Sequence, residues 1–445
     1  MQLWHTEGIT VDQAVLEFTV GEDPVLDKEL LPFDCIASAA HARVLEEMDL
    51  FEGDEYERIV AALREAFAKS SAGEIPIPIE QEDAHTALES FLVSKVGEAG
   101  LKIHTGRSRN DQVIQALRLL VRERLLQLAD RAVEFVEELI EAHHVHHRTL
   151  MPGYTHTRQA MPSTVGQLFG AAAEGTIRDL ETLSLPLSKT NRAALGSASG
   201  YGVPLPMLRR RIPELLGLDS LDTNTLFVQN TRGHLESTAI FSLHQMAITQ
   251  SRFAADLILF SSEAFRFFAL PTAITTGSSI MPQKRNPDVL ELIRALPASM
   301  LGRYVEVTGT LHGLGSGYHR DLQRTKGPLL VTLAEMARVL VLLRTTVREI
   351  EVNVGACEEA LDPSIFATDH VYRMVLDGAP FRTAYQTVKG RPPASLDRKE
   401  ILEGRTHVGA PGTDHSAALR DLLSTVAFGL DRFRRGAAIA RALVD

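Results

Sequence analysis

Residues 329–343 read LLVTLAEMARVLVLL. Apolar side chains in this stretch cover almost the whole circumference of a helix, and such a helix is buried on all sides. The stretch lies in a segment, 329–354, that contains neither glycine nor proline. Two more segments without these breakers run over 112–151 and 234–270. The stretch therefore predicts a long helix inside a helical bundle.

The length of these segments favours a bundle over an ordinary small helical domain. The 40 residues of 112–151 would form a helix about 60 Å long. Helices of globular domains average about 11–12 residues, so long bundle helices are indicated. With 163–195 and 288–311, the segments predict an up-and-down bundle of five long helices. Their outer faces are still apolar, so we expect subunits to associate.

The two ends of the chain have shorter helical patterns. Residues 1–106 are broken by GEIPIPIE, and from residue 361 onwards we expect short helices separated by Gly/Pro turns. Convincing alternating strands are missing. The sequence predicts an all-α protein with three helical domains, namely an N-terminal domain (1–106), a central bundle (107–356) and a small C-terminal domain (357–445).

Composition limits the class of protein. The formal net charge of −11 over 445 residues argues against nucleic acid or an anionic membrane surface as partner. Cys35 and Cys357 alone provide neither a disulfide framework nor zinc-ligand spacing. The start, MQLWHTEGIT, lacks a signal-peptide pattern, and no apolar run approaches the ~18 residues of a membrane span. These features predict a soluble, cytoplasmic protein.

Polar segments stand between or at the ends of the predicted helices, where a rigid scaffold usually displays its chemistry. They are QEDAHTALE (81–89), HTGRSRNDQ (104–112), MPGYTHTRQAMP (151–162), GSSIMPQKRNPD (277–288) and GYHRDLQRTK (317–326). In the fourth segment, Gly277 allows a close approach of the backbone and Lys284 supplies a compact positive charge. The combination suits a carboxylate that gains charge during a reaction. A capped helix connection, with Asp288 as cap, explains the same pattern equally well.

Two other segments also have both a functional and a structural interpretation. Arg107, Ser108, Arg109 and Asn110 stand at the head of a long helix, whose free N–H groups favour anions. Asn110 or Asp111 could equally be a simple helix cap. His156 in GYTHT is a candidate catalyst, although a lone histidine is more often a structural hydrogen-bonding residue.

The run HHVHH (143–147) raises the possibility of a metal site, because His143 and His147 lie one helical turn apart. The run falls at a helix C-terminus, where imidazolium ions complement the helix dipole, and no acidic partner follows. We therefore expect no metal there.

Taken together and in this order, the motifs resemble the fumarase/aspartase superfamily, whose signature loop has the form GSS-hydrophobic-MP-x-K-x-NP. Within it, QKRNPD and HTGRSRNDQV resemble the argininosuccinate lyase family, which includes lens delta-crystallins. The resemblance runs from about Leu3 to ATDHVYRMVLDGAPFRTAYQTV (367–388). It implies a homotetramer with a central twenty-helix core and active sites built from three subunits. The implied reaction is reversible cleavage of argininosuccinate to arginine and fumarate in arginine biosynthesis, without metal or organic cofactor.

The resemblance also implies roles in an anti β-elimination. Ser278 is the implied base, helped by Lys284 and loop N–H groups, and His156 is the implied acid or the residue that orders a proton-transferring water. Glu291 is the implied carboxylate partner of His156. The division of roles between Ser278 and His156 stays open. Residues implied for the fumarate half are Ser108, Arg109, Asn110, Thr155, Lys284 and Asn286; for the arginine half Ser38, Tyr318, Gln323 and Lys326; and in the same cleft Asp83, His85 and Thr86.

Some positions depart from the family pattern. TRQAMP follows His156 where Leu-Gln is common, Gly233 in QNTRGHLE replaces a frequent acid, and MQLWHTEG replaces a Gly-Gly-Arg-Phe element. Two alternatives therefore remain. One is a lyase acting on another N- or O-substituted succinate. The other is a silent, crystallin-like structural paralogue, which should have lost Ser278, His156, Lys284 or Glu291.

Overall fold

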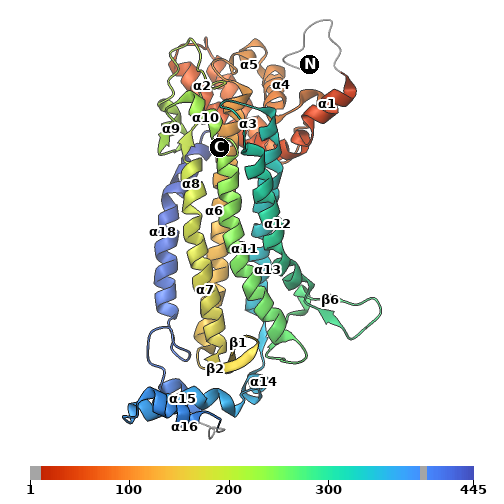
Figure 1. Cartoon of the computed structure of the whole chain (residues 1–445). Coiled ribbons are helices and arrows are strands. Elements are labelled where there is room, and N and C mark those ends of the chain that lie inside the picture. Colours follow the sequence, from red (N-terminus) through yellow and green to blue (C-terminus); the bar gives the residue numbers. More distant parts are fainter. Residues whose placement is uncertain (1–11, 391–397) are drawn as a thin grey trace.

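The computed structural model describes residues 12–390 and 398–445, so the departure at MQLWHTEG lies outside the described residues. The molecule is a long helical bundle with a group of shorter helices at each end (Figure 1). The predicted helical fold and the central bundle of long helices are confirmed. The long helices are α6 (Arg109–His146), α7 (Val165–Thr182), α11 (His234–Ser261), α12 (Asp288–Leu311), α13 (Lys326–Glu349) and α18 (Ser416–Arg441).

Shorter elements cover the two ends of the bundle. Around the upper end of Figure 1 lie α1 (Gln13–Val20), α2 (Asp23–Glu47), α3 (Glu55–Ser71), η1 (Ile79–Gln81), α4 (Ala84–Val96), α5 (Glu98–Lys102), α9 (Arg211–Leu216) and α10 (Thr225–Asn230). The remaining helices are α8 (Ser184–Thr190), η2 (Thr272–Ile274), η3 (Arg320–Thr325), α14 (Val354–Glu359), η4 (Pro363–Phe366), α15 (Ala367–Leu376), α16 (Phe381–Val388) and α17 (Arg398–Glu403). Within the described ranges, no helix combines the length and apolarity that crossing a membrane requires.

The bundle is held by a continuous apolar core along α6. Phe135 of α6, Phe169 of α7 and Phe253 of α11 are buried, and the ring centroid of Phe253 lies 6.4 Å from that of Phe135 and 6.0 Å from that of Phe169. Full burial of one such side chain stabilises a fold by about 1.5–3 kcal/mol. A second apolar cluster joins α2, α3 and α4, so the upper group of helices has a core of its own. The predicted domain boundaries at 106/107 and 356/357 stay predictions.

Helix α18 differs from the expectation for the C-terminal region. Short helices were expected after residue 361, but α18 has 26 residues and runs back along the bundle (Figure 1). Its close packing depends on Gly436, where an added Cβ would lie 2.1 Å from the carbonyl oxygen of Gly217. The buried guanidinium of Arg122 donates to that same region, with Nη2 3.4 Å from the carbonyl oxygen of Gly436. A glycine that suggests a break in sequence is here a packing contact inside a helix.

Strands are few and short, and one hairpin was not expected. The strands are β1 (Leu150–Thr155), β2 (Arg158–Thr164), β3 (Arg192–Ala193), β4 (Ser220–Leu221), β5 (Phe268–Ala269), β6 (Thr276–Gly277), β7 (Arg285–Asn286) and β8 (Glu351–Val352). Strands β1 and β2 pair antiparallel, with Thr155 opposite Arg158. His156 and Thr157 form the turn between them, at φ 52° and 59°. Prolines at both 152 and 162, which pair with each other, made this segment resemble a loop in sequence.

Candidate active site

A polar cleft opens at the upper end of the bundle, between α2, the first turns of α4 and α6, and η3. Its volume is about 150 Å³. Many residues that the resemblance implies line it, from segments far apart in the chain. The lining residues are Val20, Asp23, Asp27, Glu82, Asp83, His85, Arg109, Asn110, Val113, Arg232, Tyr318, Arg320, Gln323 and Lys326. Both carboxylates and cations line the cleft, which suits a ligand that carries both charges.

The start of α6 carries Arg109 and Asn110 to the cleft, and a capping box fixes it. Ser108 is the N-cap, since its Oγ accepts a hydrogen bond from the N–H of Asn110 at 3.3 Å. Asp111 Oδ1 accepts from the N–H of Ser108, and its Oδ2 accepts from the N–H groups of Gly196 and Ala198, each at 2.9 Å. Burial nevertheless raises the pKa of Asp111 to about 6. The anticipated cap, Asn110 or Asp111, is thus replaced by Ser108.

Ser38, which the resemblance implies for the arginine half, lies behind the cleft instead of in it. Ser38 is fully buried, and its Oγ accepts a hydrogen bond from Nη1 of Arg107 at 2.8 Å. In this structure Ser38 therefore positions Arg107 and touches no part of the cavity. Thr86 has a similar place, because its N–H and its hydroxyl both donate to Asp83 Oδ1 at 2.9 Å.

Arg109 pairs with two acidic residues that directly precede α4. Its Nη1 lies 3.0 Å from Asp83 Oδ2 and 3.4 Å from Glu82 Oε2. Burial would raise the pKa of Asp83, but the charges of His85 and Arg109 and the hydrogen bonds from Thr86 hold that pKa below its ordinary value. Asp83 is therefore ionised, and its pairing with Arg109 leaves that guanidinium partly neutralised.

Asp34 and His85 form a buried dyad at the floor of the cleft. His85 Nδ1 lies 2.8 Å from Asp34 Oδ2, and the two side chains are 4% and 0% exposed. Burial would lower the pKa of His85, but the charge and hydrogen bond of Asp34 raise it above its ordinary value. His85 Nε2 is buried and has no hydrogen-bond partner among the described residues. A carboxylate-backed imidazole with one open nitrogen is a ready proton donor or anion ligand.

On the opposite wall, η3 is engaged by the N-terminal helices. Gln323 Nε2 donates to the carbonyl oxygens of Thr19 and Val20, at 3.1 and 2.7 Å. The ammonium of Lys326 is buried and pairs with Asp27 and Asp23. Tyr318 is 40% exposed and lines the cleft. Two of the side chains implied for the arginine half, Gln323 and Lys326, thus also bind their own chain.

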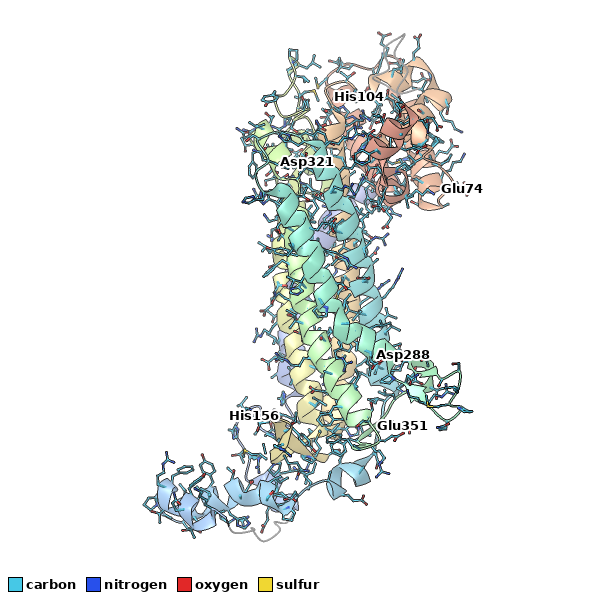
Figure 2. The ribbon with its side chains drawn as sticks, turned by 45° about the vertical axis from the view of Figure 1, so that its right-hand side comes forward. Glu74, His104, His156, Asp288, Asp321 and Glu351 are labelled. Atoms are coloured by element: carbon cyan, nitrogen blue, oxygen red, sulfur yellow. The ribbon has the colours of Figure 1, made fainter. Side chains whose placement is uncertain are left out.

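The remaining implied residues lie at the other end of the bundle. In Figure 2, His156 and Asp288 lie towards the lower end, whereas His104 and Asp321 mark the upper end. Helix α12 has 24 residues and so spans about 36 Å between the two ends. The residues kept apart from the cleft are Thr155, His156, Ser278, Lys284, Asn286 and Glu291. One chain therefore does not bring all the implied site residues together.

The loop between β6 and β7 presents Ser278 in a tight turn. Ser278 Oγ accepts hydrogen bonds from the N–H groups of Ile280 and Met281, at 3.3 and 3.1 Å. Asn286 Nδ2 lies 3.5 Å from the carbonyl oxygen of Gly277 and closes the base of the loop. Lys284 is exposed on the same loop. The turn therefore directs positive partial charge at the serine oxygen.

Within one chain, Glu291 has a partner other than His156. Its Oε1 lies 3.8 Å from Nη2 of Arg294, one turn along α12. His156 is exposed at the tip of the β1–β2 hairpin. The pairing of His156 with Glu291 stays a prediction.

Several acidic cleft residues were not anticipated from the sequence. Asp23 and Asp27 line the cleft, and Asp34 orients His85. A signal was present, because Asp27, Asp34, Ser38 and His41 recur at helical spacing on the buried face of α2, which is otherwise apolar. Each of these four is at most 1% exposed. Polar residues on the buried face of a helix point to a polar site, and this one leads into the cleft.

The histidine run at the end of α6 has structural partners. His143 Nδ1 lies 2.8 Å from the carbonyl oxygen of Gly166, and His144 Nδ1 lies 2.7 Å from Asp414 Oδ2. Over the part of the chain that the structure describes, no group of three or more His, Cys, Asp or Glu is arranged to hold a metal ion.

Solved structures that share this fold include an EDDS lyase and a class II fumarase. Over 98% of this chain and 94% of the other, EDDS lyase in complex with formate superposes with a TM-score of 0.76 at 20% identity. A class II fumarase from Schistosoma mansoni superposes with a TM-score of 0.68 at 16% identity, over 89% of this chain and 95% of the fumarase. At such identities the likeness concerns the fold alone.

Sequence relatives identify the family. A family model described as "Lyase" matches residues 8–302. Argininosuccinate lyase from Sorangium cellulosum (strain So ce56) is 38% identical over 437 residues, covering 98% of this chain and all of that protein. Argininosuccinate lyase from Parabacteroides distasonis is 39% identical over 431 residues, covering 96% of each chain. With this similarity along nearly its whole length, the chain belongs to the argininosuccinate lyase family of lyases.

Proposed function

We propose that this protein cleaves argininosuccinate to L-arginine and fumarate by a reversible anti β-elimination, as a homotetramer serving arginine biosynthesis. The named relatives carry the name of that reaction, and the four residues implied for catalysis are present here. The observation that carries the proposal is the turn around Ser278. Two backbone N–H groups donate to the oxygen that has to act as base.

Ser278 is the proposed base, which removes the proton next to a carboxylate of the succinate half. A serine hydroxyl does not ionise unaided near neutral pH, so its alkoxide needs concentrated positive potential. The N–H groups of Ile280 and Met281 supply part of it, and the charge of Lys284 on the same loop supplies more. Lys284 and Asn286 then bind the carboxylate that gains charge.

His156 is the proposed acid, which protonates the departing guanidino nitrogen directly or through one water. Proton transfer of this kind typically contributes about 10²- to 10⁴-fold to the rate. Glu291 from another subunit orients the imidazole, as Asp34 orients His85 within the cleft. The cleft itself holds the substrate through Arg109, Asn110 and Tyr318, which line it.

A complete site then requires several subunits, because the two groups of residues lie at opposite ends of each chain. Apolar side chains on the outer bundle support such an assembly. On α12, Leu292, Leu301 and Val305 are 74%, 48% and 58% exposed, and on α13 Val341 is 46% exposed. A helix face of this kind is covered by another subunit in symmetric oligomers.

The test is to mix the purified protein with argininosuccinate and follow the ultraviolet absorbance of fumarate. We expect fumarate release from argininosuccinate, none from adenylosuccinate, and none with the Ser278→Ala variant. Absence of release from a correctly assembled protein would contradict the proposal and leave another substituted succinate or a silent paralogue. Release that survives in Ser278→Ala would contradict the role of the loop.

A further inference from the structure

A second cavity lies between α6, α8, α10 and the first turn of α11, helices that can be followed in Figure 1. Its volume of about 590 Å³ falls within the range of small-molecule sites. Among the described residues, none lines both this cavity and the catalytic cleft. The lining residues are Arg118, Leu185, Ser188, Lys189, Arg192, Asp222, Phe227, Asn230, Thr231, His234 and Leu235.

The floor of the cavity is held in place by Arg118, whose side chain is 3% exposed. Its Nη1 donates to the carbonyl oxygen of Arg192 at 2.8 Å. Its Nη2 donates to Asp222 Oδ2 at 2.7 Å and to Thr231 Oγ1 at 2.9 Å. Strands β3 and β4 pair in parallel beside it, with Arg192 opposite Ser220. One buried guanidinium thus joins three segments of the chain, and its charge is balanced by the carboxylate of Asp222.

Two further cations line the cavity without such a balance. The side chain of Lys189 has no ion-pair partner among the described residues. Arg192 is 54% exposed, and its Nη1 lies 3.6 Å from Asp222 Oδ1, which is too long for a hydrogen bond. Because Arg118 already neutralises Asp222, the cavity has a surplus charge of about +2. This surplus stands out in a chain whose formal net charge is −11.

Apolar side chains lie in the same cavity as these cations. Leu185 and Phe227 both line it, and they are 52% and 51% exposed. Single exposed apolar residues are ordinary on a protein surface. Two large ones in one hollow, beside cations without partners, are instead typical of a ligand pocket, which combines apolar walls with a few polar groups.

The cavity also lies outside the faces proposed for subunit contact. Those faces belong to α12 and α13, and no residue of either helix is among those that line the cavity. The proposed contacts therefore leave the cavity open in the assembled protein.

We propose that this cavity is a second ligand site, which binds a small organic dianion with a flat apolar body. Lys189 and Arg192 pair with the anionic head group, and the side chains of Leu185 and Phe227 pack against the apolar body. Because Arg118 and Asp222 hold the floor in place before a ligand binds, little conformational entropy is lost on binding. The site is separate from the proposed lyase reaction and does not depend on it.

The test is calorimetric binding of three probes to the intact protein, which needs no turnover. The probes are phenyl phosphate, inorganic phosphate (the head group without a body) and benzyl alcohol (a body without charge). They are compared on wild type, Lys189→Gln, Arg192→Gln and Phe227→Ala. Arg109→Gln is the matched control, because it also loses one positive charge but lies in the catalytic cleft.

In wild type, we expect phenyl phosphate to bind more tightly than either of the other two probes. Lys189→Gln and Arg192→Gln should each weaken phenyl phosphate by about tenfold, since a hydrogen bond to a charged group is lost, and leave benzyl alcohol within about twofold. Phe227→Ala should weaken phenyl phosphate by about threefold and leave inorganic phosphate unchanged. Arg109→Gln should leave all three affinities unchanged.

Two results would overturn the proposal. One is that phenyl phosphate does not bind to wild type. The other is that its affinity is the same in Lys189→Gln as in wild type, because the probe would then bind elsewhere; a loss in Arg109→Gln would locate it in the catalytic cleft. Should Arg192→Gln not fold, Lys189→Gln and Phe227→Ala decide, since each removes a side chain that lies at least partly in solvent.

Discussion

At the scale of single residues, the Asp34–His85 dyad makes stability depend on pH. The pKa of His85 is raised in the folded state, so its protonation stabilises the fold below about pH 6.5, and this contribution is lost as pH rises through the folded-state pKa. Asp34→Asn removes the cause of the shift. We expect it to lower the free energy of unfolding by about 3–5 kcal/mol at pH 6 and by less at pH 9.

Urea unfolding of wild type and variant at both pH values measures this difference. Asp222→Asn is the matched control, because Asp222 is equally buried but pairs with Arg118, at 2.7 Å, instead of a histidine. Its effect should be the same at pH 6 and pH 9. An Asp34→Asn effect that is equally independent of pH would contradict the account of His85.

The structure explains one departure from the family pattern, the glycine at position 233. It precedes α11 at φ 78°, and a Cβ there would lie 2.3 Å from Cδ2 of Leu311. Gly233→Ala should therefore destabilise the fold by about 1–3 kcal/mol, from backbone strain and steric overlap together. Leu311→Ala should remove the overlap, so the double variant should be more stable than the sum of the single effects predicts. A urea-unfolding cycle measures the coupling, and strict additivity would refute the steric part.

At the scale of elements, the tip of the β1–β2 hairpin is strained. Both turn residues have positive φ, which suits Gly or Asn, and Thr157 is β-branched. Thr157→Gly keeps His156 and should raise the free energy of unfolding of this element by about 1 kcal/mol. Hydrogen exchange of the hairpin amides measures it. Thr155→Gly, in the paired strand, should lower the free energy of unfolding of the hairpin. A loss of protection from hydrogen exchange in Thr157→Gly would contradict the presence of strain at the turn.

Helix α18 offers a matched pair of glycines. Nothing lies within 4 Å of a Cβ added at Gly429, whereas one added at Gly436 meets the backbone of Gly217. Gly429→Ala should stabilise the protein by about 0.5–1 kcal/mol through helix propensity. Gly436→Ala gains the same propensity but must push α18 from the bundle, so its melting temperature should fall. Equal shifts in the two variants would show that the contact is unimportant.

At the scale of the whole molecule, the separated residue groups predict complementation between inactive variants. His156→Ala damages the lower end of the chain and Asn110→Ala the upper end. If a site takes these residues from different subunits, tetramers mixed at random from equal amounts contain about one intact site in four. Mixing by co-expression should therefore restore about a quarter of wild-type activity. A mixture of Asn110→Ala and Arg109→Ala, both at the upper end, should restore none; recovery there would contradict the arrangement.

The sequence predicted the bundle well because long segments without breakers leave few alternatives to helix. It missed α18, since Gly429 and Gly436 resemble helix breakers in sequence, and only the structure shows that the backbone of Gly217 packs against Gly436. It also missed the hairpin, whose paired prolines look like loop residues. Motifs located the segments of the candidate site, but Ser38 lies behind the cleft and Asp23 lies within it. Which polar residue faces the cavity depends on how α2 packs, and the sequence of α2 alone does not specify that.

The distance between the two ends of the bundle has a consequence for how activity should respond to dilution. If no folded chain carries a complete set of reacting groups, turnover belongs to the assembled population and not to the individual molecule. Specific activity should then fall when the enzyme is diluted below the concentration at which subunits separate, while circular dichroism still reports folded helices. Reconcentration should bring the activity back. The total rate of turnover would then depend on protein concentration in two ways, through the number of chains and through the fraction of chains that are assembled.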